Sequence, residues 1–387
     1  MSVRLSYFMA QQTVVSSTLN GKRMVDVVAV ARAVLAALAD GREEDLLHAL
    51  RIPEDRITST ENYAWWSANL KGIVDLLRKE ARSIEDGVYR LPYDMKFTQP
   101  AKLWQYNPAN MMMAFAAYYK QELNLKREEA TAPVETAHPE SKFSAPGRYP
   151  AYFTADDGFL TAQKARLMDY EMESQVWGMG DAMHRRALVR VSQVLADKDP
   201  TDATILDVGC GTGRFLTFVK DNFKHLNAVG LDLSLFNLQR ARSSLAPYGG
   251  ASFVEANAEQ MPLQSESMDV VTCNFVLSRM PIDAQVSAIN EMARVVKPGG
   301  KVVITDGSQP EFDGADVCTF DRLPTWHPSA TYSEYLRSDL EYALIKAGLF
   351  VQDKEINWVS KVLVAQKPPV VSASGSDSGT GLMGVGF

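Results

Sequence analysis

Thr204-Ile-Leu-Asp-Val-Gly-Cys-Gly-Thr-Gly213 is the stretch of sequence that decides the fold of this chain. Its first half is a short apolar strand with the acid Asp207 near its end, and a helix begins near Arg214. The glycines between strand and helix permit tight turns and let the backbone approach a ligand closely. In an open parallel sheet, this first turn from strand to helix lies where ligands bind. We therefore predict a ligand site at Asp207, Gly209, Gly211 and Gly213.

Further short apolar strands follow and alternate with helix-length segments, which predicts β-α-β units and a parallel sheet. The last two strands lie only a short turn apart, too close for a crossover helix, so we expect an antiparallel hairpin. The predicted fold is α/β, a doubly wound, mostly parallel sheet of seven strands. These strands are Thr204–Asp207, Ala228–Asp232, Ser252–Glu255, Met268–Asn274, Lys301–Thr305, Leu349–Glu355 and Lys361–Gln366.

Two acids indicate what kind of ligand the loop takes. Asp207 precedes the glycines and can hold the ammonium of an amino-acid moiety, directly or through water. Asp232 ends the second predicted strand, where a carboxylate can accept two charge-assisted hydrogen bonds from a ribose diol; alternatively it caps the helix that starts near Leu235. A nicotinamide dinucleotide fits less well, because its fingerprint places the third glycine where this chain has Arg214.

Together with the loop Asn257-Ala-Glu-Gln-Met-Pro262 and the strand exit at Asn274, these residues resemble the class I S-adenosylmethionine-dependent methyltransferases, particularly their small-molecule branch. The resemblance covers about Thr201 to Gln366 and implies a Rossmann-like fold with S-adenosyl-L-methionine as cofactor. In that family, the glycine loop holds the methionine and ribose parts, the second strand's acid binds the ribose, and the third loop meets the adenine. The cofactor contacts so implied are Asp207, Gly209, Gly211, Gly213, Asp232, Leu233, Asn257, Ala258 and Asn274.

The sequence departs from the family pattern at two places. The adenine loop usually starts with Asp, and here Asn257 stands there; its amide oxygen can still accept from the adenine amino group, and the N–H of Ala258 is unaffected. Arg279 and Met280 stand where relatives often have histidines, so no catalytic base carries over to that position.

A base is needed only if the methyl acceptor must lose a proton. The sequence offers Asp306, directly after the fifth predicted strand, and His327 in Pro324-Thr-Trp-His-Pro328 as candidate catalytic residues. Their alternatives are a turn cap for Asp306 and a solvated loop histidine for His327.

The composition of the chain indicates which kinds of binding partner to expect. The chain has 387 residues and a formal net charge of −7, which argues against binding along a phosphate backbone. No apolar run reaches the roughly 18 residues of a membrane span. Three cysteines and five histidines show no disulfide framework and no metal-ligand spacing. We therefore expect a small-molecule acceptor, no nucleic acid, no membrane span and no metal, with the oligomeric state open.

The remainder of the chain is predicted from composition and periodicity. Apolar residues on one face predict an amphipathic helix over residues 62–83, at Leu70, Ile73, Val74 and Leu77. Residues 127–148 are rich in proline and polar residues, and the C-terminal end is rich in serine and glycine. The predicted organisation is a helical domain at 1–126, a linker at 127–148, a helical lid at 149–200, the S-adenosylmethionine-binding domain at 201–367 and a disordered tail at 368–387.

The predicted lid carries two notable groups of side chains. Its aromatic residues could stack near the sulfonium by cation–π attraction, with core packing as the alternative; they are Tyr149, Tyr152 and Tyr170. His184, beside Arg185 and Arg186, is predicted to lie on a polar helix face.

A second resemblance bears on localisation. Gly87-Val-Tyr-Arg-Leu-Pro-Tyr-Asp-Met95, Gln105-Tyr-Asn-Pro108, Tyr149-Pro-Ala-Tyr-Phe153 and Gly180-Asp-Ala-Met-His-Arg-Arg186 resemble segments of methyltransferase-like proteins from cyanobacteria and plastids. The first 25 residues contain basic and hydroxyl side chains and no acid, as in a transit peptide, although an ordinary flexible N-terminus is the alternative. We expect a cytoplasmic location, with the plastid as alternative.

The predicted function is that of an S-adenosylmethionine-dependent methyltransferase acting on a small molecule. The alternative is a methyltransferase-like scaffold or assembly protein with weak or no catalysis, and a dehydrogenase comes third. The intact acid and glycine loop together with Asp232 favour the enzyme, because a decayed site would be expected to lose them.

Overall fold

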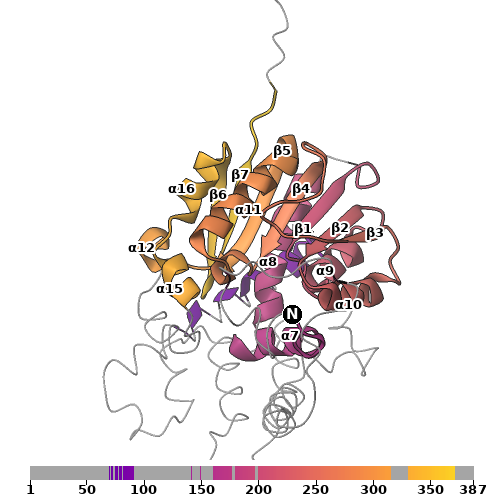
Figure 1. Ribbon diagram of the computed structural model, residues 1–387, viewed down its shortest axis with the longest axis horizontal. Coiled ribbons are helices and arrows are strands. Elements are labelled where there is room, and N and C mark those ends of the chain that lie inside the picture. Colours follow the sequence, from indigo (N-terminus) through magenta and orange to yellow (C-terminus); the bar gives the residue numbers. More distant parts are fainter. Residues whose placement is uncertain are drawn as a thin grey trace, which may run out of the picture.

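The computed structural model describes residues 69, 71–72, 75–76, 78–80, 82–90, 141, 149, 160–176, 179–196, 199–314 and 330–370. Within these residues, seven strands form one sheet in the order β3-β2-β1-β4-β5-β7-β6 (Figure 1). Strands β1 to β5 are parallel to one another, and β7 is antiparallel to both β5 and β6. The strands are β1 (Thr204–Val208), β2 (Asn227–Asp232), β3 (Ala251–Glu255), β4 (Met268–Asn274), β5 (Val296–Gly307), β6 (Phe350–Asn357) and β7 (Ser360–Gln366).

The predicted parallel sheet and the predicted terminal hairpin are both confirmed. The predicted start of the fifth strand is wrong. β5 begins at Val296, not at Lys301, and its pairing with β4 is irregular between Met268 and Val270. The segment Lys297-Pro-Gly-Gly300 has the composition of a turn. It stays in the strand because Gly300 has no side chain: a Cβ there would lie 2.9 Å from the carbonyl oxygen of Asp269.

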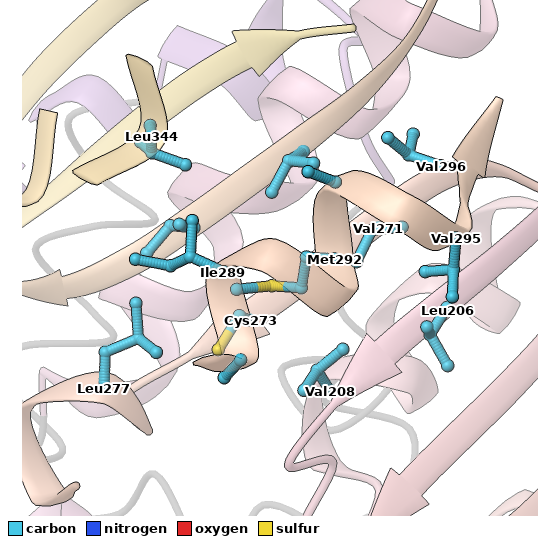
Figure 2. Close-up of a cluster of buried hydrophobic side chains, with 14 of the residues drawn as sticks. Leu206, Val208, Val271, Cys273, Leu277, Ile289, Met292, Val295, Val296 and Leu344 are labelled. Atoms are coloured by element: carbon cyan, nitrogen blue, oxygen red, sulfur yellow. The ribbon is translucent and has the colours of Figure 1, made fainter. Parts of the chain in front are cut away.

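Helices cover both faces of the sheet. Successive residues of each strand point to opposite faces, so Ile205 and Leu206 enter different apolar clusters. One cluster packs the sheet against α8 and α9; the other packs it against α11 and α16, where Ile289 and Met292 meet the strands (Figure 2). The helices are α7 (Ala162–Gln175), α8 (Gly180–Leu195), α9 (Arg214–Asn222), α10 (Leu235–Leu245), η4 (Leu277–Arg279), α11 (Ile282–Val295), α12 (Pro310–Asp313), α15 (Ala330–Leu336) and α16 (Leu340–Lys346).

Because helices cover both faces of the sheet, the central strands are rich in apolar residues. All seven residues of β4 are buried, as are the last four of β1. Strands buried on both faces carry continuous apolar runs and leave room for polar side chains mainly where the strands end. The fold therefore confines its chemistry to the carboxyl edge of the sheet.

The described N-terminal residues pack against the domain. Those between 69 and 85 are helical, two residues beyond the predicted end at 83, and the chain turns at Gly87, whose φ is +70°. The indole N–H of Trp358, in the two-residue connection between β6 and β7, donates to Oδ1 of Asn69 at 3.0 Å. This contact joins the helix to the terminal hairpin. The predicted apolar face at Leu70, Ile73, Val74 and Leu77 lies outside the described residues.

Helix α8 corrects the prediction of a polar face. Arg185 is 1% exposed and forms a buried ion pair with Glu80, and Arg186 bonds to Glu355 of β6 at 3.0 Å. The ring of His184 packs edge-on against Phe275, with 4.9 Å between the ring centroids. Because distant carboxylates neutralise both arginines, this polar stretch forms an internal junction between the N-terminal helix and the hairpin.

The other predictions for the flanking regions stay predictions. Residues 1–68, 91–140 and 371–387 lie outside the described residues, so the domain boundaries, the linker and the tail are not observed. In the part that is described, no helix has both the length and the apolar character needed to cross a bilayer.

The buried pair of Glu80 and Arg185 yields a stability prediction. Glu80→Ala should lower the free energy of unfolding by about 3–5 kcal/mol, because a buried guanidinium loses its carboxylate. Asp75→Ala on the same helix removes a half-exposed pair with Arg78 and should cost less than about 1 kcal/mol. Urea denaturation measures both, and equal effects would contradict a structural role for the buried pair.

Candidate functional site

The glycine loop joins β1 to α9 in a left-handed conformation. The φ angles of Gly209, Gly211 and Gly213 are +67°, +53° and +79°, a region that other residues rarely adopt. A Cβ on Gly209 would also lie 2.5 Å from Val276, and one on Gly213 would lie 2.7 Å from Leu245. The three glycines predicted from sequence are therefore required by the backbone, and two of them also by their neighbours.

Asp207 lies beneath this loop, at 2% exposure. Its Oδ1 accepts from the hydroxyl of Thr272 at 2.7 Å and from Nδ2 of Asn274 at 3.0 Å, both on the neighbouring strand β4. The pKa of Asp207 is raised to about 7. Burial is the main cause, the charge of Asp232 adds to it, and the two hydrogen bonds oppose the rise. The carboxylate is thus held in place but poorly compensated in charge.

Asn274 offers a second acceptor beside this carboxylate. The residue is 8% exposed, and its Oδ1 has no hydrogen-bond partner among the residues that the structure describes. A buried acceptor without a partner is costly, so its presence beside an acid suggests a missing donor. The structure thereby brings together two residues that the sequence assigned separately to the cofactor.

Asp232 ties the second strand to the glycine loop. Its Oδ2 accepts from the N–H of Gly211 at 2.9 Å, and its Oδ1 accepts from the N–H of Ser234 at 2.8 Å. Burial raises the pKa of Asp232, and the hydrogen bonds to it oppose that effect. The side-chain cap of α10 is Ser234, which accepts from the N–H of Asn237; Asp232 supports that cap from outside the helix. Leu233 lies half-buried between them.

The loop after β3 contains the predicted adenine contacts. Oδ1 of Asn257 accepts from the N–H of Glu259 at 3.0 Å, and Nδ2 of Asn257 donates to Oε1 of Glu259 at 3.2 Å. The backbone N–H of Ala258 makes no hydrogen bond to any described residue. Asn257 and Ala258 are both half-buried in this loop.

Helix α7 covers the glycine loop. Sδ of Met168 would lie 3.0 Å from a Cβ on Gly211, and the hydroxyl of Thr212 donates to Asp169 at 2.6 Å. Asp181, in the first turn of α8, forms an ion pair with Arg214 at the start of α9. The sequence predicted a helical lid here but not these contacts, because nothing local marks Asp169 or Asp181 as partners of the loop.

Of the three aromatic residues of the predicted lid, the structure describes the side chain of Tyr149 only. Tyr149 is 7% exposed in the apolar cluster with Leu231, and its hydroxyl donates to Glu259 at 2.8 Å. This position supports core packing for Tyr149. Tyr152 and the side chain of Tyr170 lie outside the described residues, so stacking on a sulfonium stays a prediction.

His184 lies at the carboxyl edge of the sheet, against Phe275 at the exit of β4. Burial lowers its pKa to about 4, so the imidazole is neutral near pH 7. Its Nδ1 lies 2.9 Å from the carbonyl oxygen of Gly180 and must carry the proton, because a carbonyl only accepts.

The predicted catalytic acid lies deeper than the sequence indicates. Asp306 is fully buried at the end of β5, where its carboxylate accepts from the N–H of Ser278 at 3.2 Å and from the N–H of Gly307 at 2.8 Å. Burial raises its pKa, and those bonds oppose the rise. This geometry fixes the exit of β4 to that of β5. His327 lies outside the described residues, so its role stays a prediction.

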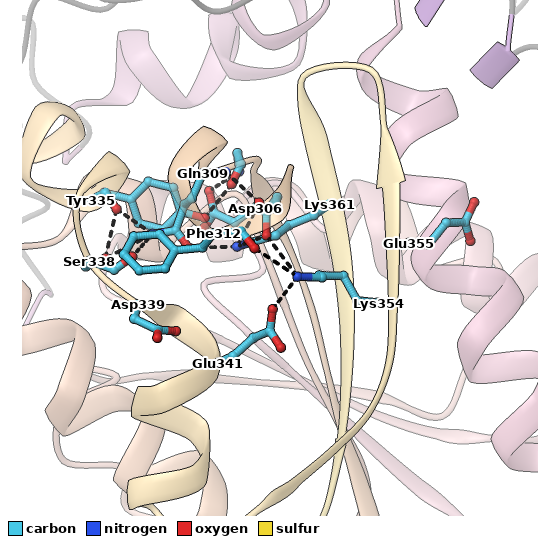
Figure 3. A network of polar contacts seen from close by, with 12 residues as sticks. Asp306, Gln309, Phe312, Tyr335, Ser338, Asp339, Glu341, Lys354, Glu355 and Lys361 are labelled. Atoms are coloured by element: carbon cyan, nitrogen blue, oxygen red, sulfur yellow. Dashed lines mark hydrogen bonds and ion pairs between the residues drawn. The ribbon is translucent and has the colours of Figure 1, made fainter. Parts of the chain in front are cut away.

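A polar network that the sequence did not predict supports the chain beyond β5 (Figure 3). Nζ of Lys361, on β7, donates to Oε1 of Gln309 at 2.6 Å and to Asp313 at 3.0 Å. Gln309 also donates to the carbonyl oxygens of Tyr335 and Ser338. The network joins α12 and α15 to the terminal hairpin.

These residues fit S-adenosylmethionine. Asp207 and Oδ1 of Asn274 form a pair of acceptors suited to the ammonium of a methionine moiety. The N–H of Ala258, which has no acceptor among the described residues, suits a ring nitrogen of adenine. A pyrophosphate fits this set less well, because the N–H of Gly211 already donates to Asp232 and two carboxylates, Asp207 and Asp232, lie at the loop. Among the described residues, no cluster of three metal-ligating side chains occurs.

The pKa of Asp207 leads to a prediction on stability. Since the folded pKa is above the ordinary value of about 3.9, folding favours the protonated acid, and the stability from this group falls as the pH rises from about 4 to 7. Asp207→Asn keeps an oxygen for Thr272 and Asn274 but has no charge. Without ligand, the variant should gain about 2–3 kcal/mol relative to wild type as the pH rises from 5 to 8. Urea denaturation at both pH values measures this, and parallel pH profiles would contradict it.

The central part of this chain is similar in sequence to known proteins. Residues 205–300 match the family described as methyltransferase domain. A demethylmenaquinone methyltransferase from Bacillus licheniformis is 38% identical over 116 residues, which cover 30% of this chain and 49% of that protein. A malonyl-[acyl-carrier protein] O-methyltransferase from a Marinomonas species is 35% identical over 116 residues, or 29% of this chain and 42% of that protein. The chain thus spans about half the length of the relatives it matches.

The strand order agrees with this match. A solved S-adenosylmethionine-dependent methyltransferase from Aquifex aeolicus aligns with 53% of this chain and 97% of its own, at 16% identity and a TM-score of 0.39; the fold assignment rests on the strand order and not on that alignment. Five parallel strands in the order β3-β2-β1-β4-β5, followed by an inserted antiparallel strand, place the acid and the glycine loop at the first turn from strand to helix. Residues 205–300 therefore match a methyltransferase domain, and they lie in a doubly wound sheet that has the acid and the glycine loop at its first turn from strand to helix.

Proposed function

We propose that this protein transfers a methyl group from S-adenosylmethionine to a small-molecule acceptor. The observation that carries the proposal is the pair of acceptors at the glycine loop formed by Asp207 and Oδ1 of Asn274, which has no hydrogen-bond partner among the described residues. Together they suit an ammonium group. Asp232, one strand away, suits a ribose diol, so the spacing of the groups follows the parts of one ligand.

The residues of the site would bind and orient the reactants. The cofactor, when bound, supplies a methyl group already activated on a sulfonium, so the protein has mainly to align the acceptor and exclude water. Asp207 and Asn274 would hold the ammonium, Asp232 and Leu233 the ribose, and Asn257 with Ala258 the adenine. Gly209, Gly211 and Gly213 would let the ligand lie against the backbone. Helix α7, which already contacts Gly211, would shield the site from water.

Removal of a proton from the acceptor, where the acceptor must lose one, requires a base. Asp306 and His327 are the candidate bases. The raised pKa of Asp306 suits a proton acceptor, whereas its two backbone donors and full burial favour a positioning role at the exits of β4 and β5. Relatives are named for demethylmenaquinone and for malonyl-[acyl-carrier protein], which supports a small-molecule or carrier-borne acceptor without selecting one.

The proposed location is the cytoplasm, with the plastid as alternative. The plastid alternative is supported by the N-terminal composition of basic and hydroxyl residues without acids. A fluorescent fusion of the full chain, compared with one that lacks residues 1–25, would distinguish the two.

Ligand titration tests the proposal. By calorimetry, wild type should bind S-adenosylhomocysteine and should not bind NAD. Binding of NAD alone would indicate a dehydrogenase, and binding of neither would favour the scaffold. A methyl-transfer screen of cell-extract fractions would then identify the acceptor.

Asp232→Ala should weaken the binding of S-adenosylhomocysteine by about 2–3 kcal/mol, because charge-assisted hydrogen bonds to the ribose are lost and the N–H of Gly211 loses its acceptor. Asp202→Ala is the matched control, since Asp202 is exposed just before β1, at the opposite edge of the sheet. An unchanged dissociation constant in the folded Asp232 variant would refute the ribose assignment.

A further inference from the structure

The side-chain amide of Asn257 is held in one orientation by Glu259. Its nitrogen donates to the carboxylate of Glu259 at 3.2 Å, while its oxygen accepts from the backbone N–H of Glu259 at 3.0 Å. A rotated amide has the same shape but would turn its oxygen toward the carboxylate and its NH₂ toward the N–H. Both hydrogen bonds would then become repulsive contacts. The two bonds therefore select one of two otherwise equivalent orientations.

Glu259 is itself fixed by a residue far away in the sequence. The hydroxyl of Tyr149 donates to Oε1 of Glu259 at 2.8 Å, across a sequence separation of 110 residues. The ring of Tyr149 is buried in the cluster that contains Leu231 and Ala256, at the ends of β2 and β3. The carboxylate that orients Asn257 is thus anchored to the core of the domain.

We infer that Glu259, held by Tyr149, is the positioning residue that makes the adenine end of the site selective for a 6-aminopurine over a 6-oxopurine. The inference rests on the proposed function, in which Asn257 faces the adenine. With the amide fixed, the second lone pair of Oδ1 accepts from a 6-amino group and opposes a 6-oxo group. An aspartate at position 257 would accept in either orientation and need no such partner. Glu259 therefore compensates for the amide at this position.

The test compares two ligands whose purines differ at position 6 and, as a consequence, in the proton on the neighbouring ring nitrogen N1. Calorimetry with the full-length protein gives dissociation constants for S-adenosylhomocysteine and for S-inosylhomocysteine, which carries a 6-oxo group. Wild type should prefer the adenosyl ligand. Glu259→Ala should reduce that preference about tenfold, because the amide loses its hydrogen bond to a charged group and is then oriented only by the backbone N–H of residue 259. Some preference should remain, because the N–H of Ala258 does not depend on Glu259.

Two further variants separate positioning from mere support of the loop. Adding Asn257→Asp to Glu259→Ala should restore the preference, because both oxygens of the aspartate accept. Tyr149→Phe keeps the buried ring and removes only the hydroxyl, so it should give a smaller shift in the direction of Glu259→Ala. If Glu259→Ala weakens both ligands equally, or if the double variant fails to regain selectivity, the inference is overturned. Failure of wild type to bind S-adenosylhomocysteine would instead overturn the proposed function.

Discussion

The parallel pairing of β1 with β2 on one side and β4 on the other is the constraint on which the site depends. Parallel strands end at the same edge of a sheet, so Asp207, Asp232 and Asn274 are brought together although they come from three separate β-α units. Helices on both faces bury the strands and exclude polar groups from their middles. The carboxyl edge is therefore where this fold can place a carboxylate pair, a left-handed glycine loop and an unpartnered amide oxygen.

A buried acid and a strained backbone at that edge oppose folding, and the stability that offsets them comes from other parts of the domain. The buried Asp207 resists ionisation, and Phe275 adopts a φ of +55° at the exit of β4, a strained conformation for a side chain of its size. Stability comes from the apolar clusters on both faces of the sheet. Two buried networks hold the outer elements against the sheet, one joining Glu80 and Arg185, and the other joining Lys361 to Asp313.

Segments that precede the domain complete the site. Helix α7 lies on the glycine loop through Met168 and Asp169, while Tyr149 reaches Glu259 in the loop after β3. The cofactor end of the domain is consequently built from residues on both sides of the matched segment 205–300. The chain segment before β1 thus contacts both the proposed methionine end and the proposed adenine end of the site. A segment with contacts at both ends is well placed to cover the site.

The sequence by itself determined the approximate strands, their parallel direction, the closing hairpin and the three glycines, because periodicity and backbone freedom are local properties. It misplaced the start of β5, where Gly300 allows a close backbone approach that no local pattern shows. It also treated Arg185 and Arg186 as a solvated face and left the partners of Asn257 and Asn274 unknown. Only the tertiary structure decided these, because the burial of a polar group and the partner that satisfies it depend on segments as distant as Glu80 from Arg185 and Tyr149 from Glu259.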